Sequence, residues 1–426
     1  MSWSEEDLRA LRVFVRGKRR NETAYKGVIG PSVFSTRLPS DLSPNRLTQA
    51  VERLRAEGLE ILDLTESNPT RAGFAYPPDL LAPLADPRGL MYAPQPFGAL
   101  VARCAVAADY TRRGAEVEPE RIVLTASTSE AYSLVFKVLC DPGDEVLVPR
   151  PSYPLLEHLT RLEAVVATPY DLEYDGCWSI DFGSLDRALS DRTRAVLIVS
   201  PNNPTGSFVK AEELAHLAAL CASRQVALIA DEVFADYELK PGVTGAAGRI
   251  TARQDALVFS LGGLSKSIGL PQAKLAWIAV GGPEPLVRSA IGRLELASDA
   301  YLSVSTPVQL ATADLLRTGA GVRAQIRARV ARNYRQLLEC GEHAPVCRVL
   351  DAEGGWYAVL QVPSLGSEED LVLDLLTTHH VLVHPGYFFD FKRESYLIVS
   401  LLAPEQTFMQ GILRILRHFG CSDWPA

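Results

Sequence analysis

Long apolar runs are missing from this chain of 426 residues, although 47% of its residues are hydrophobic. No run approaches the roughly 20 residues that a membrane-spanning helix needs, so the sequence predicts a soluble protein with no membrane partner. The length exceeds that of one ordinary domain, and the hydrophobic content is that of a folded chain rather than a disordered or fibrous one. We therefore expect two compact units, each with a buried core.

An excess of basic residues and a paired set of cysteines are missing as well. The 51 acidic residues outnumber the 43 basic ones, for a formal net charge of -8, which argues against a protein that binds the nucleic-acid backbone. The seven cysteines are odd in number and show no CxxC spacing, which favours reduced thiols over a disulfide framework or a metal site. We expect a cytoplasmic protein with no nucleic-acid partner and no metal.

A regular alternation of short apolar runs and helical patterns begins at Arg121. Segments such as SEAYSLVFKVL and AEELAHLAALCASR carry apolar residues at helical spacing. They separate five strand-like runs: RIVLTAS, DEVLVPRPSY, AVLIVSPNNPTG, VALIADEVF and ALVFSLGG. This alternation predicts a large α/β domain with a mostly parallel sheet flanked by helices.

The remainder of the chain predicts a smaller α+β domain. It contains a long amphipathic helix at about 321–340, the strand-like run GGWYAVLQV and a closing helix near 406–419. The first sixty or so residues precede the segment LDLTESNPT and are expected to form an arm. We place the arm and part of the small domain at residues 1–85, the large domain at 86–300 and the C-terminal small domain at 301–426.

Two charged residues follow apolar runs, at the strand ends where ligands collect in parallel sheets. Asp231 comes directly after VALIA, where a buried carboxylate needs a cationic partner or a helix to cap. Lys266 follows a turn of small residues after the run ALVFS. Burial there would favour the neutral amine, which is a nucleophile toward aldehydes, whereas a solvated turn lysine would carry no chemistry.

Hydroxyl, amide and aromatic side chains follow other runs. Ser127, Thr128 and Ser129 stand between a strand and a helix, where they either bind a phosphate or only cap the helix. The turn PNNPTG is either a ligand site or a plain strand exit, and Tyr153 either stacks on a flat ring or packs in the core. A single ligand could match these residues if it had an aldehyde for Lys266, a basic ring nitrogen for Asp231, a phosphate for the hydroxyls and a planar ring for Tyr153. Pyridoxal 5′-phosphate has all four, and the sequence therefore predicts it as cofactor.

The motifs that carry these residues resemble those of the class I/II aminotransferases, fold-type I enzymes of the aspartate aminotransferase superfamily, from about Leu62 to the end. The matching segments are YAPQPFG, LTASTSEA, PSYP, NNPTG, ADEVFADY, LSKSIGLPQAKLAW and HPGYFF. The resemblance implies that Lys266 forms the internal aldimine with the cofactor and that Asp231 binds its ring nitrogen. It implies further that Asn203 contacts the ring O3′ and, with the substrate present, also binds the substrate.

The resemblance also implies the remaining cofactor contacts and the assembly. Tyr153 would stack on the ring, and the phosphate would be held by Ser127, Thr128, Ser129 and Lys274. Tyr92 would reach the phosphate of a neighbouring subunit, which implies a homodimer with shared active sites. The implied reaction moves an amino group from a small-molecule amino donor, an amino acid or related amine, to a 2-oxo acid acceptor.

Three positions depart from the family pattern. Phe234 stands where a tyrosine usually bonds O3′, and Gly263 stands where a phosphate-binding hydroxyl is common. Ile398 occupies the place of an arginine that clamps the substrate carboxylate as a bidentate pair. Either another cation takes over, with Arg37, Arg71 and Arg393 as candidates, or the substrate is not a standard α-amino acid.

Other functions stay open on these residues alone. The same cofactor chemistry supports a lyase that eliminates at the β or γ carbon, since the fold does not fix which Cα bond breaks. A cofactor-binding regulator would need a DNA-binding segment, and the first 60 or so residues show no helix-turn-helix pattern. A non-catalytic relative is disfavoured by Lys266, Asp231 and Asn203, and a dinucleotide-binding enzyme by the missing GxGxxG.

Overall fold

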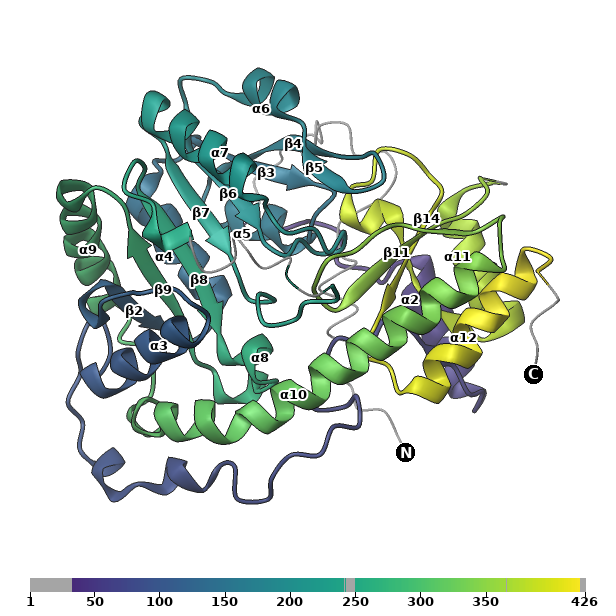
Figure 1. The fold of residues 1–426 in the computed structure, drawn as a ribbon, viewed down its shortest axis with the longest axis horizontal. Coiled ribbons are helices and arrows are strands. Elements are labelled where there is room, and N and C mark those ends of the chain that lie inside the picture. Colours follow the sequence, from purple (N-terminus) through teal and green to yellow (C-terminus); the bar gives the residue numbers. More distant parts are fainter. Residues whose placement is uncertain (1–32, 241, 243–249, 365, 422–426) are drawn as a thin grey trace.

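The large region is built on an eight-stranded mixed sheet. The computed structural model describes residues 33–240, 242, 250–364 and 366–421, and Figure 1 shows a large and a smaller region. The strand order is β2-β9-β8-β7-β6-β3-β4-β5, in which β8, β7, β6, β3 and β4 run parallel and β9 is antiparallel to both neighbours. The strands are β2 Ile122–Thr125, β3 Glu145–Arg150, β4 Val166–Tyr174, β5 Trp178–Ile180, β6 Thr193–Val199, β7 Ala227–Asp231, β8 Val258–Gly263 and β9 Ala276–Gly281.

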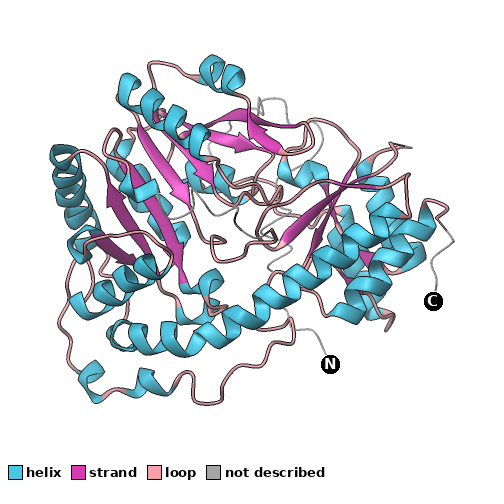
Figure 2. Cartoon of the chain, in the orientation of Figure 1, coloured by secondary structure: helices cyan, strands magenta, loops and turns pink. Residues whose placement is uncertain are grey.

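Helices cover both faces of this sheet (Figure 2). One face packs against α4 Thr128–Leu139, α5 Leu155–Leu162 and α9 Glu284–Asp299. The other packs against α3 Leu100–Arg112, α6 Phe182–Ala188, α7 Ala211–Arg224 and the first part of a long helix, α10. Every residue of β2, β8 and β9 is buried, as expected for strands covered on both sides. The predicted α/β fold is confirmed.

The smaller region holds an antiparallel sheet of order β10-β11-β14-β13 and a two-stranded sheet, β1-β12. The pairing of Leu62 with Val381 joins a segment early in the chain to this C-terminal region. The part of the arm before residue 33 lies outside the described residues. The elements here are α2 Arg46–Ala56, β1 Leu62–Asp63, β10 Arg348–Val349, β11 Tyr357–Gln361, α11 Glu368–His379, β12 Val381–Leu382, β13 His384–Pro385, β14 Tyr396–Ser400 and α12 Glu405–His418.

Helix α10, Thr306–Glu342, runs from the large region to the small one (Figure 1). The sequence predicts a start near Gly321, and the structure places it at Thr306, with Pro307 in the first turn. Two glycines in the segment TGAGV look like helix breakers, but Gly319 lies inside the helix against Ile268. A Cβ at Gly319 would come within 2.8 Å of the Ile268 Cδ1, so close packing accounts for that glycine.

Short elements complete the fold. The one-turn helix α8, Leu264–Ser267, directly follows β8 and carries Lys266. The 3-10 turns are η1 Ala82–Ala85, η2 Pro87–Leu90, η3 Pro119–Arg121, η4 Ile250–Ala252, η5 Pro271–Ala273 and η6 Gly386–Phe389. Among the helices of the described ranges, none combines the length and the apolar character needed to cross a bilayer.

Candidate active site

A cavity of about 290 Å³ lies at the carboxyl ends of β6, β7 and β8 and is closed on one side by β11 of the small region. Ser67 and Tyr357 contribute the small-region side of the wall. The structure brings seven of the residues singled out in the sequence to this one wall: Ser127, Thr128, Ser129, Tyr153, Asn203, Asp231 and Lys266. They come from five separate chain segments, so only the fold assembles them.

Lys266 is held inside an aromatic enclosure. Its Nζ lies 4.8 Å from the ring centroid of Trp356 and 5.6 Å from that of Phe234. The hydroxyl of Tyr237 donates to the Lys266 carbonyl oxygen and fixes the backbone of α8. Burial lowers the Lys266 pKa to about 8, and attraction to Asp231 and Glu66 offsets this only in part. A substantial fraction of this amine is therefore neutral near pH 8, as a nucleophile requires.

Asp231 is the last residue of β7 and faces the cavity with an engaged carboxylate. The Tyr132 hydroxyl on α4 donates to its Oδ2 at 2.7 Å, and the Val233 backbone N–H donates to its Oδ1 at 3.1 Å. Burial raises the Asp231 pKa, and these hydrogen bonds oppose the change. A cationic group in the cavity would favour the ionised carboxylate, so Asp231 suits a protonated ring nitrogen.

The N-terminus of α4 offers donors to an anion. Ser127 is its N-cap, and the Ser127 Oγ accepts the Glu130 backbone N–H at 3.2 Å. The Glu130 carboxylate turns back and accepts the Ala126 N–H at 2.5 Å. The capping role is therefore present, while Thr128 and Ser129 in the first turn still line the cavity. A 12-residue helix with hydroxyls at its N-terminus is suited to bind phosphate.

Asn203 supplies an unpaired polar atom. Its Oδ1 is buried and has no hydrogen-bond partner among the described residues, although it stands at the cavity wall. A buried amide oxygen without a partner is costly, and an N–H or O–H donor on a ligand would remove that cost. Together with the Lys266 amine, the Asp231 carboxylate and the α4 N-terminus, Asn203 fits the donor and acceptor pattern of pyridoxal 5′-phosphate.

Other predicted residues lie elsewhere in the single chain. Lys274 is exposed just after η5 in a left-handed conformation, with φ of 51°, and Tyr92 is 75% exposed on a surface loop. Arg37 is exposed and donates to the Leu162 carbonyl at 3.0 Å. Arg71 and Arg393 are exposed as well. No arginine occurs among the described residues that line the cavity.

Two of the three departures from the family pattern line the cavity, and the third lies in the core of the small region. Phe234 lines the cavity, with its ring edge-on to Trp356 at 5.2 Å. Gly263 also lines it, and a Cβ there would stand 3.0 Å from the Ala276 Cβ, so a larger residue would need a shift. Ile398 is fully buried in β14, paired with Val359, and contributes to the small-region core.

Several residues that shape the site gave no signal in the sequence. Tyr132 reads as one apolar position of an amphipathic helix, and Trp356 and Tyr357 read as strand residues. Glu66 is partly buried between strands, and its Oε1 accepts the Asn68 N–H at 2.6 Å. Burial raises the Glu66 pKa to about 7, while the charge of Lys266 acts in the opposite direction. Its position beside Lys266 follows from contacts between distant chain segments.

This fold and this arrangement of residues define an enzyme of the aminotransferase class. A family model described as "Aminotransferase class I and II" matches residues 61–407, and the chain belongs to that family. The family is typically dependent on pyridoxal phosphate.

Individual relatives agree with this assignment. The chain is 29% identical over 390 residues to alanine aminotransferase of Mycobacterium tuberculosis, covering 86% of this chain and 87% of that protein. It is 25% identical over 360 residues to glutamate-pyruvate aminotransferase AlaA of Escherichia coli, covering 82% of this chain and 88% of the relative. The fold is similar to an aminotransferase from Escherichia coli, with a TM-score of 0.79 at 24% identity over 92% of this chain and 99% of that one. The predicted aminotransferase activity is confirmed.

Proposed function

We propose that this aminotransferase uses pyridoxal 5′-phosphate, held in the cavity by the residues that converge there. Lys266 would hold the aldehyde carbon, Asp231 the ring nitrogen and Asn203 the ring O3′. Ser127, Thr128 and Ser129 would hold the phosphate, with Lys274 adding positive charge and Tyr153 stacking on the ring. The observation that supports this most is the placement of Lys266, Asp231 and Asn203 around one cavity.

The bound cofactor supplies an aldehyde that condenses with amines and a ring that accepts electrons from a Cα bond. The chain supplies the base and the orientation. Lys266 Nζ, whose pKa burial lowers to about 8, would be the base that takes the proton from the substrate Cα. Asp231, held by Tyr132, would keep the ring nitrogen of the bound cofactor protonated. The aromatic rings of Phe234 and Trp356 lie against the lysine Nζ, with centroids at 5.6 and 4.8 Å.

We propose an amino acid and a 2-oxo acid as donor and acceptor. The relatives named above are alanine and glutamate-pyruvate aminotransferases, which supports small substrates of this kind. For the carboxylate we propose Asn203 and Arg71, because Arg71 follows four residues after the cavity-lining Ser67. Arg37 was an equal candidate in the sequence, but its guanidinium donates to the carbonyl of Leu162, which does not line the cavity. Arg71→Ala should raise the KM for the oxo acid about tenfold, and Arg37→Ala should leave it unchanged. Unchanged values in both would remove both candidates.

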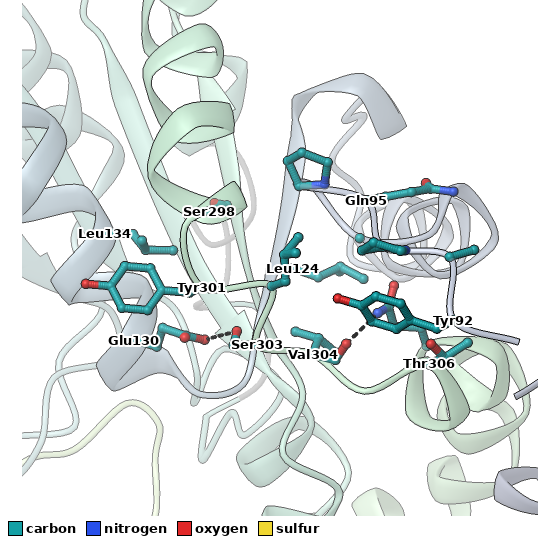
Figure 3. A pocket seen from close by; sticks show the side chains of 16 residues that line it. Tyr92, Gln95, Leu124, Glu130, Leu134, Ser298, Tyr301, Ser303, Val304 and Thr306 are labelled. Carbon is teal, nitrogen blue, oxygen red and sulfur yellow. Dashed lines mark hydrogen bonds between the residues drawn. The ribbon is translucent and has the colours of Figure 1, made fainter. Parts of the chain in front are cut away.

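We propose that the enzyme is a homodimer with shared active sites. A small pocket of about 40 Å³ separates the loop that carries Tyr92 from the segment after α9 that carries Tyr301 (Figure 3). Leu90 and Met91 directly precede Tyr92 in this loop, and all three side chains are largely exposed. Exposed apolar side chains gathered in this way are typical of a contact surface. If a second subunit covered these side chains, Tyr92 of the first subunit would lie near the cavity of the second.

We also propose a cytoplasmic location. All seven cysteines are free thiols in the structure, which suits a reducing compartment.

The decisive experiment for the function is a panel of amino donors with the purified enzyme. Each amino donor that the enzyme accepts should convert the cofactor stoichiometrically to its amine form. Mass spectrometry should then identify the 2-oxo acid that corresponds to that donor. Ammonia release with no aminated cofactor would favour a lyase and contradict the proposal. Light scattering should give the mass of two chains, and a mass of one chain at micromolar concentration would contradict the dimer.

A further inference from the structure

A second group of chemically capable side chains lies far from the cavity, where α11 and α12 end side by side. Within the described part of the chain, one cluster has the composition of a metal site: Asp374, His379 and His418. Asp374 and His379 belong to α11, and His418 is the last residue of α12. One ligand atom from each residue lies within 4.8 Å of the other two. Figure 1 shows the two helices adjacent in the small region.

The spacing of these atoms is that of ligands around a tetrahedral metal. The His418 Nδ1 lies 3.3 Å from the His379 Nε2 and 3.4 Å from the Asp374 Oδ2. Zinc bonds of about 2.0–2.2 Å to nitrogen and oxygen place neighbouring ligands of a tetrahedron about 3.3–3.5 Å apart. Two of the three ligand separations therefore already equal a tetrahedral edge.

Hydrogen bonding alone explains this arrangement less well. The His418 Nδ1 can donate to the Asp374 Oδ2 at 3.4 Å or accept from the His379 Nε2 at 3.3 Å, but a single nitrogen cannot do both at once. Both distances exceed the donor–acceptor separation of about 2.7–3.2 Å that is usual for N–H hydrogen bonds. A cation at the point common to the three atoms would instead accept a lone pair from each.

The surroundings hold the ligands in place. The Thr378 hydroxyl donates to the Asp374 Oδ1 at 2.7 Å, which leaves Oδ2 directed at His418. The Arg414 guanidinium donates to the His379 carbonyl oxygen at 2.9 Å and ties α12 to the end of α11. Contacts of this kind orient metal ligands in known sites. A cavity of about 220 Å³ that Asp374 and His418 help to line gives solvent access to a fourth ligand position.

We propose that Asp374, His379 and His418 bind a divalent first-row transition-metal cation of the zinc class, with water as fourth ligand. Two imidazoles and one carboxylate suit zinc better than calcium or magnesium, which prefer oxygen ligands. The cation would clamp the last turns of α11 and α12 together and stabilise the small region. This site is independent of the proposed cofactor chemistry. The composition gave no sign of it, because His418 is distant in the sequence from the other two ligands.

The test measures zinc binding by isothermal titration calorimetry with the full-length enzyme. Exposed thiols also bind zinc, so Cys104 and Cys177 are first replaced by serine in all proteins compared. The parent should take up about one equivalent and melt at a higher temperature with zinc. His379→Gln and His418→Gln should each weaken binding at least tenfold and abolish the thermal shift. The matched control is His343→Gln, which changes an exposed histidine at the end of α10.

Cobalt provides a second readout of geometry. Cobalt(II) bound to the parent should show the visible absorption of a tetrahedral site without a thiolate charge-transfer band. Asp374→Asn, which preserves shape, guards against a variant that fails to fold and should lose the cobalt spectrum while keeping far-UV dichroism. A zinc concentration of about 100 μM is well above the dissociation constants of known structural sites. If the parent takes up no zinc at this concentration, the proposal is overturned. Equal uptake by the parent and both histidine variants would overturn it as well.

Discussion

The hydroxyl of Tyr132 donates a 2.7 Å hydrogen bond to the Oδ2 of Asp231, and so joins the first helix of the cavity wall to the end of the central strand. Tyr132 is buried and Asp231 is partly buried at the cavity, and burial raises the pKa of each. The bond favours the ionised carboxylate, because the phenol donates to its charge. Tyr132 therefore orients Asp231, which we propose as the partner of the ring nitrogen, and favours its ionised form.

Removing this bond should weaken the cofactor site. Tyr132→Phe keeps the ring and deletes the donor, so the Asp231 pKa should rise further and the affinity for pyridoxal phosphate should fall about three- to tenfold. Fluorescence titration of the apoenzyme measures this. Tyr110→Phe is the matched control, since its buried hydroxyl bonds Ser260 at 2.9 Å and Tyr110 does not line the cavity. Equal losses of affinity in the two variants would contradict a specific role for Tyr132.

Glu66 should make the apoenzyme less stable as the pH rises. Burial raises its pKa from 4.5 to about 7, so the folded chain favours the protonated form. The stabilisation is complete below about pH 4.5 and is lost as the pH passes through about 7. Relative to Glu66→Gln, the melting temperature of the parent should fall by about 1–3 °C between pH 5 and pH 8. Glu116→Gln, at an exposed position, serves as control. Parallel curves for parent and Glu66→Gln would refute the assignment.

Phe234 should raise the pKa that is read from the absorption spectrum of the bound cofactor. The ring lines the cavity and offers no hydrogen-bond donor, so the charge on the cofactor's O3′ has fewer partners. The pKa read from the cofactor absorbance should therefore be higher in the parent than in Phe234→Tyr. A spectrophotometric pH titration of both proteins decides this. A parent value at or below that of the variant would show that another donor serves O3′.

Two glycines in α10 should respond oppositely to alanine. At Gly319 a Cβ would meet Ile268 Cδ1 at 2.8 Å, two residues from Lys266, so Gly319→Ala should destabilise the enzyme by about 1–3 kcal/mol. At Gly321 nothing lies within 4 Å, so Gly321→Ala should stabilise it by up to about 1 kcal/mol through helix propensity. Urea unfolding of the two variants measures both. A stabilised Gly319→Ala would show that Ile268 yields without cost.

These glycines also show where sequence patterns reach their limit. The strands β2, β3, β6, β7 and β8 and the residues after them were predictable, because apolar runs that end in polar residues are a local signal. The motif residues Lys266, Asp231 and Asn203 follow the same signal. The start of α10 was misplaced, because a glycine that permits close helix packing looks the same in sequence as one that ends a helix. Only the tertiary contact with Ile268 distinguishes them.

The missing parts of the site have the same cause. Tyr132, Trp356 and Glu66 reach Asp231 and Lys266 from distant segments, so no spacing pattern connects them. The carboxylate clamp is a further example. Arg37 and Arg71 were equivalent as sequence positions, and only the structure shows that the Arg37 guanidinium donates to the Leu162 carbonyl at the end of α5.

The central claim concerns the amine of Lys266 in the cavity wall. Borohydride reduction of the holoenzyme followed by peptide mass spectrometry tests this claim most directly. Reduction fixes the cofactor to the lysine that holds it. We predict that the added mass appears on the peptide that contains Lys266 and that Lys266→Ala abolishes both the label and the visible absorbance. A label on another lysine such as Lys274, or a colourless protein after incubation with pyridoxal phosphate, would contradict the account.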